Sequence, residues 1–144
     1  MNAYEYLNQL RQIDYKIKNA KSELERLETL ATTASAIDYT RESIQNGKAE
    51  QEPAFVRTLD QIADKMARLD EMLTSYECIR EKIYNQVNTL PNAQQSRVLY
   101  LRFFEFKTLE KISCELNYSF YGVRAIYRGG LRSFRRIYGE EFDG

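Results

Sequence analysis

The first quarter of the chain carries apolar residues at intervals of three and four. From Ile13 to Ala34 the apolar positions follow one another in steps of 4, 3, 4, 3, 4 and 3 residues. This alternation averages 3.5 residues and is typical of a coiled-coil seam. Residues 3–37 are therefore expected to form one long helix, whose apolar stripe needs a partner.

Residues 54–89 repeat the same pattern. Their apolar positions from Phe55 to Tyr76 again follow steps of 4, 3, 4, 3, 4 and 3. The polar residues 38–53, which include Asn46-Gly47, are expected to form the loop between the two helices. Two helices of matched length joined by such a loop fold most simply into an antiparallel hairpin. Pairing of the same stripes with a second copy of the chain stays open, so a homodimer through the hairpin is a candidate assembly.

The pattern changes after Leu90-Pro91, where the expected helices become short and cover roughly 92–105, 108–116 and 119–136. Thr108 and Ser119 are suited to begin helices as N-caps, and Asn117 to end one. The short connection between the last two helices is typical of a helix-turn-helix unit.

The predicted fold class is all-α, a long antiparallel helical hairpin (coiled coil) followed by a small three-helix helix-turn-helix module. The expected domains are residues 1–89 for the hairpin, 90–138 for the helix-turn-helix module and 139–144 for a tail.

The residue composition excludes several kinds of catalytic and metal-binding site. The chain has no His and no Trp, so an imidazole base and an imidazole metal ligand are excluded. Cys78 and Cys114 are isolated and are expected to be reduced, half-buried thiols rather than zinc ligands. The chain also lacks a glycine-rich phosphate loop and an activated nucleophile. We therefore expect a protein that is not an enzyme and that uses no metal and no cofactor.

Hydropathy gives an expectation about location. The N-terminal sequence contains no apolar run long enough for a signal peptide or a membrane span. A soluble cytoplasmic protein with no membrane partner is expected.

The net charge of zero conceals an asymmetry. Residues 1–89 contain 12 basic and 15 acidic residues, whereas residues 90–144 contain 9 and 6. The stretch 116–136, LNYSFYGVRAIYRGGLRSFRR, holds five arginines and no acidic residue. Four of them are spaced by 4, 4 and 3 and share one helical face. Such a face either binds a polyanion or is solvated, with arginine stems covering apolar surface.

Residues 90–131 resemble region four of bacterial sigma factors. The likeness rests on Leu90-Pro91, on Val98-Leu99 with Leu101-Arg102-Phe103, on Thr108 through Leu116, on Asn117-Tyr118-Ser119, and on Val123 and Leu131. With the preceding hairpin and the polar connection, residues 4–135 resemble phage and mobile-element transcriptional regulators of the ArpU and RinA type. The resemblance implies DNA binding and transcription regulation, with RNA polymerase as a further partner.

The docking geometry of helix-turn-helix units assigns roles to individual residues. The N-terminal end of the second helix meets base edges, and neighbouring groups hold phosphates. The base-edge candidates are Phe120, Tyr121, Arg124 and Ala125, and Arg124 could pair with a guanine. The remaining candidates for contact with duplex DNA are Lys107, Thr108, Lys111, Ser119, Arg128, Arg132, Arg135 and Arg136.

Three glycines depart from the sigma-like pattern. Gly122 removes a side chain from the first turn of the recognition helix. Gly129-Gly130 leaves two alternatives: the helix kinks or ends there, or Gly130 permits a close helix contact. Two other functions also stay open, a coiled-coil interaction protein with a degenerate helix-turn-helix, and a DNA-packaging component like the small terminase subunits of phages.

Overall fold

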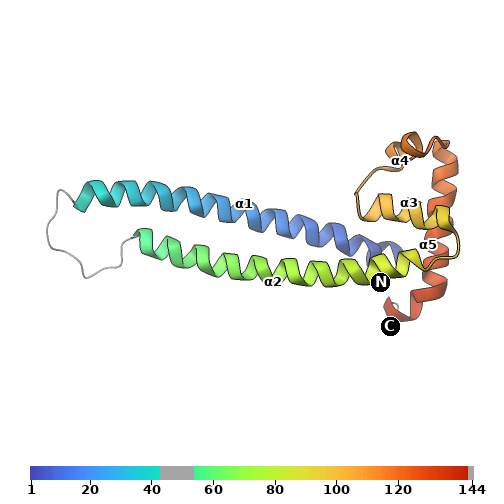
Figure 1. The fold of residues 1–144 in the computed structure, drawn as a ribbon, viewed down its shortest axis with the longest axis horizontal. Coiled ribbons are helices and arrows are strands. Elements are labelled where there is room, and N and C mark those ends of the chain that lie inside the picture. Colours follow the sequence, from blue (N-terminus) through green and yellow to red (C-terminus); the bar gives the residue numbers. More distant parts are fainter. Residues whose placement is uncertain (43–53, 143–144) are drawn as a thin grey trace. The chain divides into compact units, whose positions relative to one another are not determined.

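The computed structural model describes residues 1–42 and 54–142, and these residues form α-helices and no strand. The all-α prediction is confirmed for this part of the chain. The helices are α1 (Ala3–Glu42), α2 (Ala54–Asn88), α3 (Ala93–Phe103), α4 (Leu109–Leu116) and α5 (Phe120–Phe142) (Figure 1).

Two helices are longer than the sequence predicted. Helix α1 continues through residues 38–42, which were expected to belong to a loop. The rest of that expected loop, including Asn46-Gly47, lies outside the described residues. Helix α5 was expected to end near Arg136 and runs to Phe142. Residues 139–142, expected as part of a tail, are helical because Phe142 packs against the hydrophobic core, with its ring 4.7 Å from that of Tyr6.

The chain divides into two compact units. The first unit combines Met1–Asp14 with Ser75–Gly144, and the second unit comprises Tyr15–Thr74. Both long helices pass from one unit into the other, so each unit contains a piece of α1 and a piece of α2.

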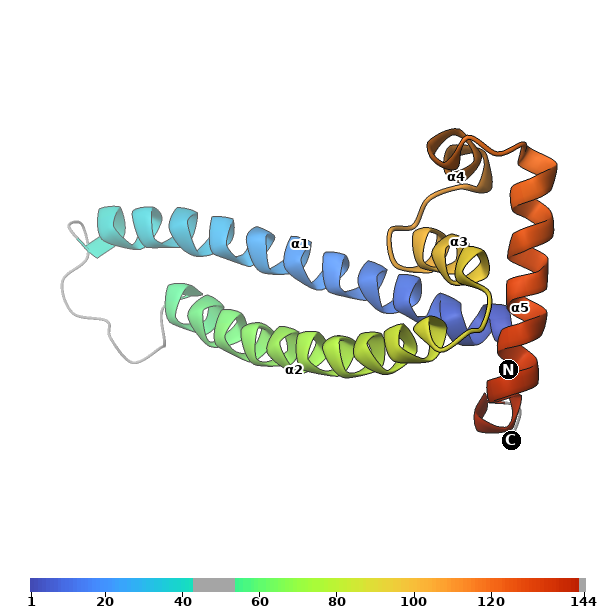
Figure 2. The same cartoon turned by 45° about the vertical axis from the view of Figure 1, so that its right-hand side comes forward.

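In the second unit, α1 and α2 run side by side in opposite directions (Figures 1 and 2). Ile17, Leu27 and Leu69 are buried, as the seam pattern predicted. Leu59 and Met66 belong to the same predicted stripe but are 44% and 50% exposed. The apolar stripe of α2 is therefore wider than the part that α1 covers.

The first unit is built around two hydrophobic clusters. In the larger one, Leu7 of α1, Ile83 of α2, Leu99 of α3 and Phe134 of α5 are fully buried together. The start of α1 and the end of α2 thus share a core with α3 and α5. The boundary that we expected between residues 89 and 90 falls within this unit.

The smaller cluster holds α3, α4 and the first half of α5 together through Val98, Leu101, Ile112 and Val123, which are all completely buried. The predicted ends of α4 are confirmed. Thr108 is its N-cap, and Asn117 ends it in the left-handed conformation at a φ of 58°. The three residues 117–119 then connect α4 to α5.

Gly130 permits a close contact between α3 and α5. Helix α5 continues through both glycines, so the alternative that it ends at Gly129-Gly130 is wrong. A Cβ atom on Gly130 would lie 3.2 Å from Cγ and 3.3 Å from Cδ1 of the buried Leu99. A side chain at position 130 would hold the two helices apart.

A polar network joins the last turns of α5 to both long helices. The hydroxyl of Tyr6 donates to Oε1 of the buried Gln86 at 2.7 Å. The amide nitrogen of Gln86 in turn donates to Glu141 Oε2 at 2.7 Å. Burial raises the pKa of the Tyr6 hydroxyl. The hydroxyls of Thr89 and Tyr138 also share a hydrogen bond.

The two cysteines are more exposed than expected. Cys78 and Cys114 are free thiols and are exposed, so the prediction of half-buried thiols is wrong. Each lies on the polar side of its helix.

In the described part of the chain, none of the helices combines the length and the apolar character that crossing a membrane requires.

Candidate nucleic-acid surface

One face of α5 is covered by arginine side chains, and we call it the arginine face. Its members are all exposed and comprise Tyr121, Arg124, Arg128, Arg132, Arg135 and Arg136. At about 100° per residue these positions fall within roughly 120° of the helix circumference. The side of α5 that carries Val123, Gly130 and Phe134 is buried, so packing of the core orients the arginines toward solvent.

The arginine face carries a dense positive charge. No acidic residue occurs between Leu116 and Gly139. In residues 1–42 and 54–142, the side chains of Arg124, Arg128, Arg132 and Arg136 make no ion pair or hydrogen bond. Arg124 and Arg136 are twelve positions apart, which is roughly 18 Å along the helix. Five positive charges over this length exceed what a single carboxylate can neutralise.

The beginning of α5 presents Tyr121 most openly, at 76% exposure. Ser119 lies just before this helix, and its hydroxyl accepts a hydrogen bond from the backbone N–H of Gly122 at 3.0 Å. A Cβ on Gly122 would lie 3.0 Å from that hydroxyl oxygen, so the glycine leaves room for the serine cap. Tyr121 and Arg124 thus project from a well-formed helix start.

Phe120 and Arg102 serve mainly to support the surface. Phe120 is half-buried and lines a small cavity with Leu109 and Tyr127. Arg102 donates to the backbone carbonyl of Lys107 at 3.2 Å and braces the connection between α3 and α4.

The candidates beside α4 differ from the arginines. Nζ of Lys107 lies 2.8 Å from Glu115 Oε2 and 3.4 Å from Glu105 Oε2. The hydrogen bond to Glu115 raises the pKa of Lys107, and its charge is already balanced locally. The Thr108 hydroxyl accepts from the backbone N–H of Lys111 as the N-cap of α4. Lys111 is exposed on α4.

A second arginine cluster escaped the sequence analysis. Arg97 lies over the ring of Tyr100 at 6.0 Å, and Arg80 lies over the ring of Phe104 at 5.2 Å. Tyr84 packs edge-on against both rings. The sequence signal was an arginine three residues before Tyr100 and another four residues before Tyr84, spacings that place such pairs on one helical face.

Comparison of the chain with protein-family models, with curated proteins and with solved structures finds no match. The described residues also contain no group of three Cys, Asp or Glu side chains that could hold a metal ion. The arginine face and the sigma-like resemblance of residues 90–131 are therefore the two features of the chain that bear on its function.

Proposed function

We propose that this chain binds duplex DNA through the arginine face of α5 and acts as a transcriptional regulator of phage or mobile-element type. The main support for DNA binding is the row of exposed arginines with no acidic residue among them. Transcription regulation, and RNA polymerase as a partner, rest on the sigma-like resemblance alone.

The charge of the arginine face favours a polyanion over a single acidic group. Neighbouring guanidinium groups on one helix repel each other, and no carboxylate within 116–139 offsets the repulsion. Duplex DNA carries about one negative charge per 1.7 Å of its axis. Binding to it would release condensed counterions, which provides the driving force and makes the affinity strongly dependent on salt.

The arrangement of α4 and α5 supports the interpretation that the arginine face belongs to a helix-turn-helix unit. Two helices joined by residues 117–119 bury Ile112 and Val123 against α3, while Tyr121 and Arg124 project from the start of α5. In helix-turn-helix proteins this end of the second helix meets base edges. We assign Tyr121 and Arg124 to base contact and the later arginines to phosphates.

The test is binding of the full chain to mixed-sequence duplex DNA by fluorescence anisotropy. The Arg128→Gln/Arg132→Gln variant removes two charges from the arginine face. Arg57→Gln/Arg68→Gln removes two exposed charges from α2 in the second unit and is the matched control. We expect the first variant to bind less tightly and its slope of log affinity against log salt to be smaller by about 2.

The control variant should bind like the unchanged chain. An equal loss in both variants would mean that net charge, rather than the arginine face, determines binding. Absence of binding to duplex DNA at low salt would contradict the proposal and would favour a coiled-coil interaction protein, for which exposed Leu59 and Met66 provide an apolar surface.

A further inference from the structure

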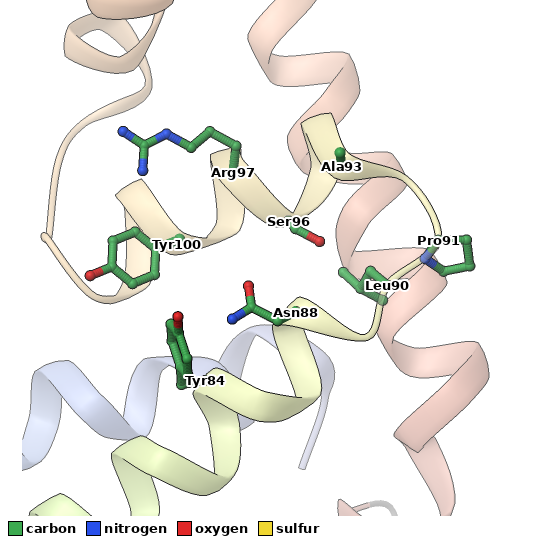
Figure 3. A pocket seen from close by; sticks show the side chains of 8 residues that line it. All are labelled: Tyr84, Asn88, Leu90, Pro91, Ala93, Ser96, Arg97 and Tyr100. Atoms are coloured by element: carbon green, nitrogen blue, oxygen red, sulfur yellow. The ribbon is translucent and has the colours of Figure 1, made fainter.

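A pocket lies in the first unit where α2 leads into α3 (Figure 3). It encloses about 530 Å³ and opens to solvent. Residues of both helices and of the connection between them contribute to it. Its lining comprises Tyr84, Asn88, Leu90, Pro91, Ala93, Ser96, Arg97 and Tyr100.

Aromatic rings form one wall of the pocket. The rings of Tyr84 and Tyr100 meet edge-on, with centroids 6.1 Å apart and planes at 72°. Tyr100 also stacks on Phe104 at 5.0 Å, which fixes its ring in place. The tyrosine hydroxyls make no hydrogen bond to any described residue, so both are available as donors at the pocket.

The polar groups of the pocket favour a negatively charged ligand with carbonyl groups. Arg97 contributes a guanidinium group, and none of the lining residues is acidic. The amide of Asn88 faces the open space between Tyr84 and Ser96 and makes no hydrogen bond within the described chain (Figure 3). The hydroxyl of Ser96 is already used, because it donates to the carbonyl of Val87 at 2.9 Å.

We propose that this pocket binds an extended, acidic, proline-containing segment of a partner protein. Proline-rich segments in the polyproline II conformation dock into grooves lined by aromatic rings, because their backbone is extended and their carbonyls are exposed. Tyr84 and Tyr100 provide the aromatic wall, Asn88 donates to a backbone carbonyl, and Arg97 pairs with a carboxylate of the segment. The charge of Arg97, unopposed in the lining, selects an acidic segment over a basic one.

The pocket is separate from the arginine face. Gly130, which contacts α3, lies about 160° around α5 from both Arg128 and Arg132. The two surfaces can therefore be occupied at the same time, whether or not the arginine face binds DNA.

The test uses a fluorescein-labelled peptide of four Glu-Pro repeats, blocked at both ends, with the full chain in an anisotropy titration. Peptides of four Lys-Pro and four Glu-Ser repeats control for charge and for proline. We expect the Glu-Pro peptide to bind best. Arg97→Gln should weaken it at least about tenfold, which is the ordinary effect of losing a hydrogen bond to a charged group. Asn88→Ala should weaken it less, and Arg128→Gln should leave it unchanged.

Several results would overturn the proposal. If no Glu-Pro peptide binding is seen, or if the Glu-Ser peptide binds equally well, the pocket does not recognise proline segments. Loss of peptide binding in Arg128→Gln, or displacement of the peptide by duplex DNA, would place the peptide on the arginine face. If Arg97→Gln weakens duplex binding as much as Arg128→Gln does, the pocket belongs to a nucleic-acid surface instead.

Discussion

Substitution of Gly130 by alanine should destabilise the protein, whereas the same substitution at Gly129 should not. Both positions lie inside α5, so each alanine gains about 1 kcal/mol of helix propensity. At position 130 the new Cβ would lie 3.2 Å from Cγ of Leu99, a side chain with no exposed surface and little room to move. Overpacking of this kind costs about 1–3 kcal/mol.

At position 129 the nearest atom is Nε2 of Gln95, 3.0 Å from the new Cβ. That atom ends a flexible, half-buried side chain, which can rotate away at small cost. The gain in helix propensity is common to both variants and cancels between them. The expected difference in free energy of unfolding is therefore the overpacking cost alone, about 1–3 kcal/mol in favour of Gly129→Ala.

Urea unfolding followed by circular dichroism measures this difference, provided that the free energy of unfolding falls with urea concentration at the same slope in both variants. Equal stability of the two alanine variants would refute the reasoning, because it would mean that α3 and α5 are not held at the separation that Gly130 sets. A loss of stability in Gly129→Ala alone would refute it as well.

Three further predictions concern pH, assembly and recognition. Burial raises the pKa of Tyr6, so the folded chain keeps this proton at a pH where the unfolded chain loses it. The contribution of the Tyr6 hydroxyl to the stability of the fold is complete below about pH 10 and is lost as the pH rises through the pKa of the folded chain. Between about pH 9 and 11, the urea midpoint of the unchanged chain should therefore fall more steeply than that of Tyr6→Phe. The exposed Leu59 and Met66 should pair the hairpins of two copies of the chain, so light scattering should show a dimer. The Leu59→Lys/Met66→Lys variant should be a monomer. The control variant Asp64→Lys, which changes the opposite side of α2, should remain a dimer. Arg124→Ala should cost about 1–3 kcal/mol on a duplex selected from a random pool and less on other sequences, whereas Arg135→Ala and Arg136→Ala should weaken all duplexes alike.

Periodicity predicted the two long helices and the faces that they bury, but not how completely each face is covered. Ile17, Leu27 and Leu69 are buried as their spacing required. Leu59 and Met66 follow the same spacing and remain exposed. The spacing of apolar residues shows which face of a helix is apolar, but it does not show where the partner helix packs on that face.

Helix propensity alone did not decide between the two alternatives at Gly129-Gly130. Helix α5 continues through both glycines because Gly130 packs on Leu99 and Phe134 is buried beyond it. The caps at Thr108 and Asn117 were predictable, since they depend on local chemistry.

The arginine face could be identified from spacing alone, because all of its members lie on one helix. The pairing of Lys107 with Glu115, and the pocket between Tyr84 and Arg97, could not be predicted in this way. Each brings together residues of different elements, and their meeting depends on how the chain turns between those elements.

The most direct measurement of the central claim is the salt dependence of binding between the full chain and a mixed-sequence duplex. Fluorescence anisotropy needs no knowledge of an operator. The arginine face predicts micromolar binding at low salt and a slope of log affinity against log salt of about −4 or steeper, as expected when on the order of four phosphates are neutralised. A slope close to zero, or no binding at low salt, would contradict the claim that α5 presents its arginines to DNA.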